Sequence, residues 1–196
     1  LDARLEILET VSRLAELRDN ETGRHMKRVG IYSRLIAARL GLPARFCKDI
    51  EQFAPLHDVG KLGISDKILL APRKLTVEEF DVIKQHTTLG YRILADKPSL
   101  EMAAEIARDH HERYDGTGYP NGCAGDEIPI SAQIVALSDV YDALRTVRPY
   151  KDAWPHDRAR SEILAHRGRH FSPTVVDAFD HLHHEFEQTA AEYEDI

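Results

Sequence analysis

The sequence lacks several features that would place it in a common class of protein. Its 196 residues contain no secretory signal and no apolar run near the roughly 18–20 residues that a membrane span requires. The only cysteines, Cys47 and Cys123, have no metal-ligand spacing, so we interpret them as free thiols in a reducing compartment, with a disulfide left open. The formal net charge of −7 argues against a DNA- or RNA-binding protein, which is usually basic. We therefore expect a cytoplasmic protein without a membrane span.

Length and composition fit one compact domain with a sizeable core. Hydrophobic residues make up 42% of the chain and charged residues 30%, which is ordinary for a globular protein. Apolar positions recur at helical spacing almost throughout, and no segment alternates like a half-buried β-strand. The sequence therefore predicts an all-α fold, a multi-helix bundle.

Local signals predict where several helices begin. Thr76 and Glu79 have the spacing of a capping box, and Ser131 is expected to cap an apolar helix that reaches residue 147. Ser172 and Pro173 are expected to open the last helix. One apolar stripe predicts that this helix is continuous; it comprises Val175, Phe179, Leu182 and Phe186. We expect the tail after residue 188 to fray.

A long stretch rich in glycine and proline interrupts the helical pattern between residues 113 and 129. It contains Gly116, Gly118, Pro120, Gly122, Gly125 and Pro129. Such density predicts an ordered loop rather than a helix. Loops of this length are uncommon inside a compact domain unless they have a function.

Residues 1–19 form a predicted amphipathic helix that we treat separately from a main domain at residues 20–190. Its leucine spacing fits either a seam with a second copy, giving a homodimer, or a linker from an upstream domain. An ordinary packing helix explains the pattern equally well. The chain opens without Met, which suggests a fragment that has lost an N-terminal regulatory domain.

The pair His57-Asp58 is the centre of the predicted chemistry. A His-Asp dipeptide is weak evidence alone, and the chain holds a control in His156-Asp157, which we expect only to begin a helix. The first pair differs because Lys61 follows three residues later, beside two glycines. A carboxylate can bridge two metals while the adjacent imidazole binds one, and the lysine can pair with a phosphoryl oxygen.

A second candidate group lies on the helix expected from residue 21 to 40. Glu21 and His25 extend an inward-facing stripe that continues with Val29, Tyr32 and Ile36. Taken alone, His25 is better explained as a histidine that packs in the core. A buried Glu21 without a partner would be costly, and a metal ion would satisfy both side chains.

Four further residues extend the set of candidate ligands. His86 alone would be read as a surface histidine, and Asp139 alone as part of a solvated face, with Asp142 supporting it if it binds metal. Adjacent His110 and His111 diverge by about 100° on a regular helix, so they need a helix end or different metals. The predicted ligands are Glu21, His25, His57, Asp58, His86, His110, His111 and Asp139.

Nitrogen and oxygen ligands without thiolate suit Fe, Mn, Zn or similar divalent ions, and we expect two or three ions with Fe or Mn favoured. Two or three such ions contribute about +4 to +6 of charge against three ligand carboxylates. An acidic protein can therefore still attract a phosphate substrate to this site.

These motifs together resemble the HD-GYP branch of the HD phosphohydrolase superfamily, over about residues 8 to 179. The matching segments are Glu-Thr-Gly-Arg-His (21–25), His-Asp-Val-Gly-Lys (57–61), His86-Thr, His-His-Glu-Arg-Tyr-Asp-Gly-Thr-Gly-Tyr-Pro (110–120), Asp-Val-Tyr-Asp (139–142) and Arg-Pro-Tyr-Lys (148–151). Departures are small: Ala71 and Ser172 stand where a lysine and an aspartate are frequent, and neither is a ligand position.

The resemblance implies hydrolysis of cyclic di-GMP to pGpG, and it leaves open whether the reaction continues to GMP. It implies that Asp58 bridges two metals and that Tyr119 borders the nucleotide, and Glu21 and His25 match the positions that complete a third metal site in some members of the family. It also implies that Lys61, Arg148 and Lys151 meet the substrate phosphates. An upstream receiver or sensor domain and a GGDEF-domain protein are candidate partners.

Two other functions fit the same residues. One is hydrolysis of another nucleotide or cyclic dinucleotide by an HD-type enzyme. The other is a module that senses cyclic di-GMP without turnover, although no predicted ligand is missing. In the hydrolase, bound metals would lower the pKa of the attacking water and neutralise developing charge on the phosphate. Lys61 would add a fixed positive charge beside it.

Overall fold

The computed structural model describes residues 3–16, 23–147 and 152–194, and within these ranges the protein is helical with no β-strand. The predicted all-α class is therefore confirmed for the described chain. The α-helices are α1 (Ala3–Glu16), α2 (Gly23–Arg39), α3 (Ala44–Phe53), α4 (Asp66–Leu69), α5 (Val77–Leu94), α6 (Glu101–Asp109), α7 (Ile130–Arg145), α8 (His156–Ala165), α9 (Pro173–His181) and α10 (His183–Glu192). Short 3-10 helices are η1 (Ala54–Leu56), η2 (Val59–Gly63), η3 (Pro98–Leu100) and η4 (Gly125–Glu127). None of the described helices is long and apolar enough to cross a membrane.

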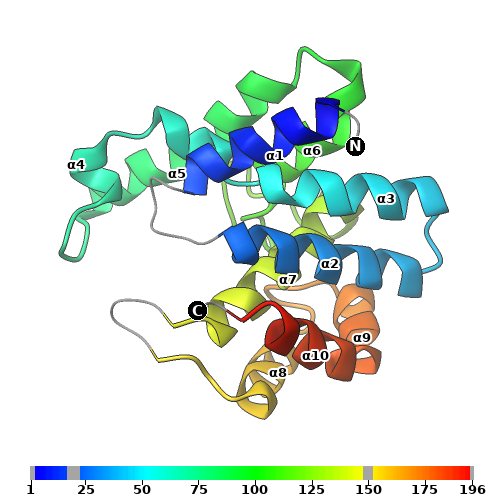
Figure 1. Cartoon of the computed structure of the whole chain (residues 1–196). Helices are drawn as coiled ribbons and strands as arrows, with labels where there is room; N and C mark the ends of the chain where they lie inside the picture. Colours follow the sequence, from blue (N-terminus) through cyan, green and yellow to red (C-terminus); the bar gives the residue numbers. More distant parts are fainter. Residues whose placement is uncertain (1–2, 17–22, 148–151, 195–196) are drawn as a thin grey trace.

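Helices α2 and α7 form the middle of the bundle. Helix α3 packs on α2, and α6 contacts α3, α5 and α7, while α8, α9 and α10 gather on the other side (Figure 1). The two central helices bury the apolar stripes that the sequence predicted, including Val29, Tyr32 and Ile36 on α2. On α7 the stripe comprises Ile134, Leu137, Tyr141 and Leu144. The core therefore lies beside the segment that carries His25.

The predicted start of α5 is confirmed, and that of α7 is wrong. Thr76 Oγ1 accepts a hydrogen bond from the Glu79 amide, and the Glu79 carboxylate accepts one from the Thr76 amide. This capping box fixes the beginning of the helix that carries His86. At α7, however, Pro129 occupies the capping position and Ser131 lies inside the helix. The Ser131 hydroxyl instead points to Glu105 of α6, at 3.4 Å.

The predicted final helix is two helices, because the chain breaks at Leu182 between α9 and α10. The break still buries Phe186 in the core, where its ring stacks on Tyr32 with centroids 4.3 Å apart. The expected fraying after residue 188 is also wrong, since α10 continues to Glu192 and buries Thr189.

Helix α1 packs against the 3-10 helices around His57 and Asp58. Ser12 and Ala15 are buried in this contact, whereas Ile7 and Leu14 remain exposed. The packing-helix interpretation thus describes one face of α1. The exposed face does not test whether a second copy of the chain packs there.

Both cysteines are free thiols, as expected.

The stretch from residue 113 to 129 is an ordered loop that returns to the bundle. A backbone bridge pairs Asp115 with Ala124 across it. The Glu112 carboxylate, 2% exposed, accepts hydrogen bonds from the amides of Asn121 at 2.7 Å and Gly122 at 3.1 Å. A buried carboxylate requires such partners. Because Glu112 directly follows His111, these hydrogen bonds hold the loop close to the His110-His111 pair.

Candidate metal centre

Seven of the eight predicted ligands lie together in two adjacent groups. One comprises Asp58, His86, His110 and His111, and the other comprises His25, His57 and Asp139. In each group, the candidate ligand atoms all lie within 4.8 Å of one another. The eighth, Glu21, lies outside the described residues, as do Arg148 and Lys151.

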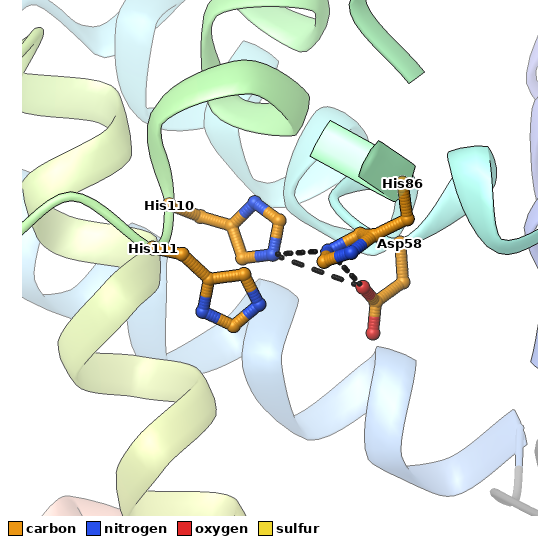
Figure 2. A group of neighbouring side chains, drawn as sticks. All are labelled: Asp58, His86, His110 and His111. Atoms are coloured by element: carbon orange, nitrogen blue, oxygen red, sulfur yellow. Dashed lines mark hydrogen bonds and ion pairs between the residues drawn. The ribbon is translucent and has the colours of Figure 1, made fainter. Parts of the chain in front are cut away.

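The first group joins three separate segments (Figure 2). Asp58 Oδ1 lies 3.2 Å from His86 Nε2 of α5 and 3.7 Å from His110 Nε2, and the two imidazole nitrogens are 3.4 Å apart. His110 and His111 follow the last residue of α6, where the helix ends. The end of the helix lets adjacent rings approach to 4.0 Å between centroids, as two neighbouring ligands require.

The second group joins α2, the η1–η2 turn and α7. Asp139 Oδ1 lies 3.6 Å from His25 Nε2 and 3.9 Å from His57 Nε2. Two atoms that both bind one ion, each about 2.0–2.2 Å from it, lie within about 4 Å of each other. The spacing in both groups therefore fits a shared cation.

Asp58 faces both groups. While its Oδ1 points to His86 and His110, its Oδ2 lies 3.2 Å from His57 Nε2. The same Oδ2 lies 2.7 Å from Lys61 Nζ. His57 and Asp58 occupy the tight turn between two 3-10 helices, which directs these neighbouring side chains into one space. Asp58 is the residue whose carboxylate could bridge two ions.

The imidazoles are oriented as metal-binding histidines are. The Nδ1 atoms of His57, His86 and His110 lie 2.7–3.0 Å from backbone carbonyls, which fixes the proton on Nδ1 and leaves Nε2 as the acceptor facing the centre. His57 Nε2 and Asp58 Oδ1 are buried and make no hydrogen bond of standard geometry to the described residues. Buried polar atoms of this kind need a partner, and a cation would satisfy both. The donor set thus fits divalent metal.

The electrostatics of the first group favour the ligand states that metals need. Burial raises the pKa of Asp58, but the charges of Lys61 and His57 outweigh it and hold that pKa well below its usual range. Burial lowers the pKa of both His110 and His111, the latter strongly. The carboxylate is therefore charged and these two imidazoles are neutral at pH 7.

His57 behaves differently. Burial lowers its pKa, yet the nearby negative charge of Asp58, with that of Asp139 further away, raises the pKa to about 10. At pH 7 a proton on His57 therefore balances the buried Asp58 carboxylate. A divalent cation carries the same sign and would compete with that proton.

An aromatic and cationic rim borders the first group. Tyr119 stacks on His111 with ring centroids 4.8 Å apart, which places its ring beside the first group. Phe80 of α5 meets Tyr119 edge-on at 6.5 Å and is 45% exposed. Lys84 Nζ lies 5.2 Å from the Phe80 centroid and 5.7 Å from that of Tyr119. Phe80 and Lys84 were not among the predicted site residues, and no periodic pattern in the sequence indicates that they lie at this rim.

The control dipeptide is less isolated than expected. His156 begins α8 as predicted, but its Nδ1 lies 2.8 Å from the Tyr141 hydroxyl and its Nε2 lies 3.1 Å from His183 Nδ1. His183 is half-buried in this contact, whereas His181 and His184 are exposed. No metal-ligand group of three includes His156 among the described residues.

Comparison with known proteins places these residues in context. A family model described as an HD domain matches residues 9–175. The chain is 51% identical over 180 residues to a cyclic di-GMP phosphodiesterase of Thermotoga maritima, covering 91% of this chain and 49% of that protein. It is 45% identical over 190 residues to the cyclic di-GMP phosphodiesterase response regulator RpfG of Xanthomonas campestris, covering 94% and 50%. The chain thus spans about half the length of these relatives.

Among solved structures, the fold matches that of a cyclic GMP-AMP-specific phosphodiesterase of V. cholerae. The TM-score is 0.72 at 18% identity, and the match covers 97% of this chain and 51% of the other. At this identity the likeness concerns the fold.

Proposed function

Since the chain belongs to the HD domain family, we propose that it is a metal-dependent phosphodiesterase that hydrolyses cyclic di-GMP to pGpG and on to GMP. The observation that carries the proposal is the convergence of seven histidine and carboxylate side chains in two adjacent groups, with Asp58 facing both. The identity of about half to the two named phosphodiesterases supports the substrate. We propose two or three divalent ions, Fe or Mn, as the cofactor.

The proposed ligands divide as the two groups do. Asp58, His86, His110 and His111 would hold one ion, and His25, His57 and Asp139 a second, with Asp58 bridging. Glu21, four residues before His25, would complete a third site with it. Bound ions would supply a water of lowered pKa as the nucleophile and positive charge beside the phosphoryl oxygens.

The chain's own residues prepare that step. Backbone carbonyls accept hydrogen bonds from Nδ1 of His57, His86 and His110, so that each Nε2 is already directed toward the centre before an ion binds. Lys61 Nζ forms an ion pair with Asp58 Oδ2 at 2.7 Å, and the lysine side chain is 15% exposed. We propose that its ammonium turns to a substrate phosphoryl oxygen, and that Arg148 and Lys151 orient the second phosphate.

Tyr119 and Phe80 are proposed to receive a guanine base, because one ring is fixed on the metal group and the other is exposed beside it. Stacking of a base on an aromatic ring contributes about 1–3 kcal/mol. We expect Phe80→Ala to raise KM about 5-fold or more with little change in kcat, and Phe80→Trp to restore it. Steady-state kinetics with cyclic di-GMP would measure both.

The matched control is Val77→Ala, which shortens another exposed apolar side chain one turn earlier on α5. An unchanged KM in Phe80→Ala would exclude Phe80 from substrate binding.

The experiment that tests the function is turnover by anaerobically purified protein loaded with Fe²⁺ or Mn²⁺. We expect pGpG first and GMP later, resolved by chromatography, and faster hydrolysis of cyclic di-GMP than of cyclic GMP-AMP. Saturable binding without either product would instead favour the sensing module. Preferred hydrolysis of another nucleotide would favour a different HD-type hydrolase.

The chain is proposed to be the output domain of a larger bacterial signalling protein in the cytoplasm, because its named relatives are about twice as long as the matched part. Residues 1–19 would then be the linker to a receiver or sensor domain, or a dimer seam, and residues 20–190 the catalytic domain. The printed description of one relative as a response regulator supports the receiver. A GGDEF-domain protein remains a proposed partner.

A further inference from the structure

Arg28 is a buried arginine on α2, one turn after His25 and only 3% exposed. Its Nε donates to Asp142 Oδ1 at 2.7 Å, and its Nη2 donates to Asp142 Oδ2 at 2.9 Å. Asp142, on α7, is fully buried. This two-point contact is the strongest geometry available to an arginine and a carboxylate, and it fixes the orientation of both groups.

Asp142 in turn orients His25 through a hydrogen bond. Its Oδ2 lies 2.8 Å from His25 Nδ1, while His25 Nε2 lies 3.6 Å from Asp139 of the second metal group. A carboxylate on one ring nitrogen fixes the tautomer and rotation of a histidine that binds metal through the other. Asp142 therefore supports His25, rather than its neighbour Asp139 as the sequence suggested.

The remaining arm of Arg28 points to the end of the chain. Its Nη1 donates to the backbone carbonyl of Tyr193 at 2.6 Å. Arg24, one turn earlier, donates to the carbonyl of Glu194. Figure 1 shows the chain passing from α10 toward the ends of α2 and α7. Two arginines one turn apart on α2 thus donate hydrogen bonds to two successive backbone carbonyls after α10.

We propose that Arg28 and Asp142 are positioning residues for His25, and that the segment after α10 sets the metal affinity of the His25–His57–Asp139 group by holding Arg28. The inference rests on the metal centre of the proposed function. Arg28 Nη2 also donates to Thr146 Oγ1 at 3.2 Å, so every nitrogen of the guanidinium has a partner and Asp142 and the His25 ring stay fixed. Without the Tyr193 carbonyl, Arg28 keeps its partners on the α7 side but can tilt about them, and His25 loses part of its preorganised direction.

The same contacts have a purely structural explanation, in which Arg28 ties α2 to α7 and the end of α10. Both explanations predict a loss of stability when Arg28 is removed, because the Asp142 carboxylate would lose a buried partner. They differ over metal. A structural tie gives an unchanged affinity of the folded protein, whereas a positioning role lowers the affinity of one group and leaves the other intact.

The test is Mn²⁺ titration of the metal-free chain by calorimetry, with bound metal counted by elemental analysis. Three variants weaken the contacts by different routes: Arg28→Lys, Arg24→Ala, and a chain ending at Ala191. The last places its new terminal carboxylate two residues short of the Tyr193 carbonyl. We expect one of the two binding steps, that of the His25–His57–Asp139 group, to lose about 10–100-fold in affinity in Arg28→Lys, the scale for outer-shell partners of metal ligands. The other two variants should lose several-fold in the same step, and the remaining step should be unchanged in all three.

Arg160→Lys is the control, because Arg160 of α8 pairs with Asp180 Oδ1 of α9 at a more exposed site and neither residue belongs to a metal group. It should leave both binding steps unchanged. Wild-type Mn²⁺ affinities in Arg28→Lys would overturn the positioning role. Wild-type affinities in both Arg24→Ala and the shortened chain would overturn the role of the C-terminal segment. Absence of Mn²⁺ binding by the unaltered chain would instead refute the proposed centre.

Discussion

Replacing Asp58 with Asn is expected to abolish both metal retention and turnover. The asparagine keeps the size of the side chain but loses the charge that faces His86, His110 and His57 from one carboxylate. Loss of an outer-shell partner already costs about 10–100-fold in metal affinity or activity, so loss of a bridging ligand should cost more than about 100-fold. Elemental analysis and the pGpG assay measure the two losses on the same preparation.

The chain provides the control in Asp157→Asn, which removes the carboxylate of the other His-Asp dipeptide. Asp157 is exposed at the start of α8 and belongs to neither metal group among the described residues. It should retain metal and turnover at the level of the unaltered chain. Survival of turnover in Asp58→Asn would show that hydrolysis does not depend on the proposed centre. Loss of turnover with full metal content would limit Asp58 to a role beside the ions.

The helical stripe on α2 could be predicted because its cause is local. A period of 3.6 residues puts His25 on the buried face with Val29 and Tyr32, and the structure buries all three. Arg28 lies next to the same stripe, three residues after His25, and could have been recognised as a buried charge that needs a carboxylate. The identity of that carboxylate, Asp142, could not, because it depends on how α7 crosses α2.

The break between α9 and α10 shows the limit of periodic patterns. Val175, Phe179 and Phe186 are all buried, as a continuous helix would bury them. The chain nevertheless turns at Leu182, and Phe186 reaches the core by stacking on Tyr32. The stripe records which residues are apolar and does not record the direction that the chain takes between them. For the same reason, His183 could not be paired with His156 from the sequence.

Gly60→Ala is expected to cause the largest loss of stability among small substitutions near the centre. An added Cβ would lie 1.8 Å from the His86 carbonyl oxygen and 2.5 Å from the Gly90 amide nitrogen. Both are backbone atoms of α5, which cannot rotate away as a side chain can. Alanine restricts the unfolded chain and so would normally stabilise by about 0.4–1 kcal/mol. The steric cost of about 3 kcal/mol or more exceeds this gain.

The clash should also damage the first metal group. To accept the methyl group, η2 must move away from α5, and Asp58 then separates from His86, whose Nε2 now lies 3.2 Å from Asp58 Oδ1. At about 2–4 °C per kcal/mol for a chain of this size, the net loss corresponds to a Tm about 4–10 °C lower. We expect the metal content to fall in parallel. Thermal unfolding and elemental analysis measure the two effects.

Gly63→Ala is the control in the same 3-10 helix. There the nearest atom to an added Cβ is Leu89 Cδ1 at 2.9 Å, the end of a side chain that can turn, and Gly63 is exposed. Its Tm should stay within about 2 °C of the unaltered chain, since surface substitutions change stability by about 0.5 kcal/mol. If Gly60→Ala and Gly63→Ala had the same Tm and metal content, the close contact between Gly60 and α5 would not be what holds Asp58 near His86. A loss confined to Gly60→Ala would tie the geometry of the centre to that one contact, because the same methyl group is tolerated three residues later.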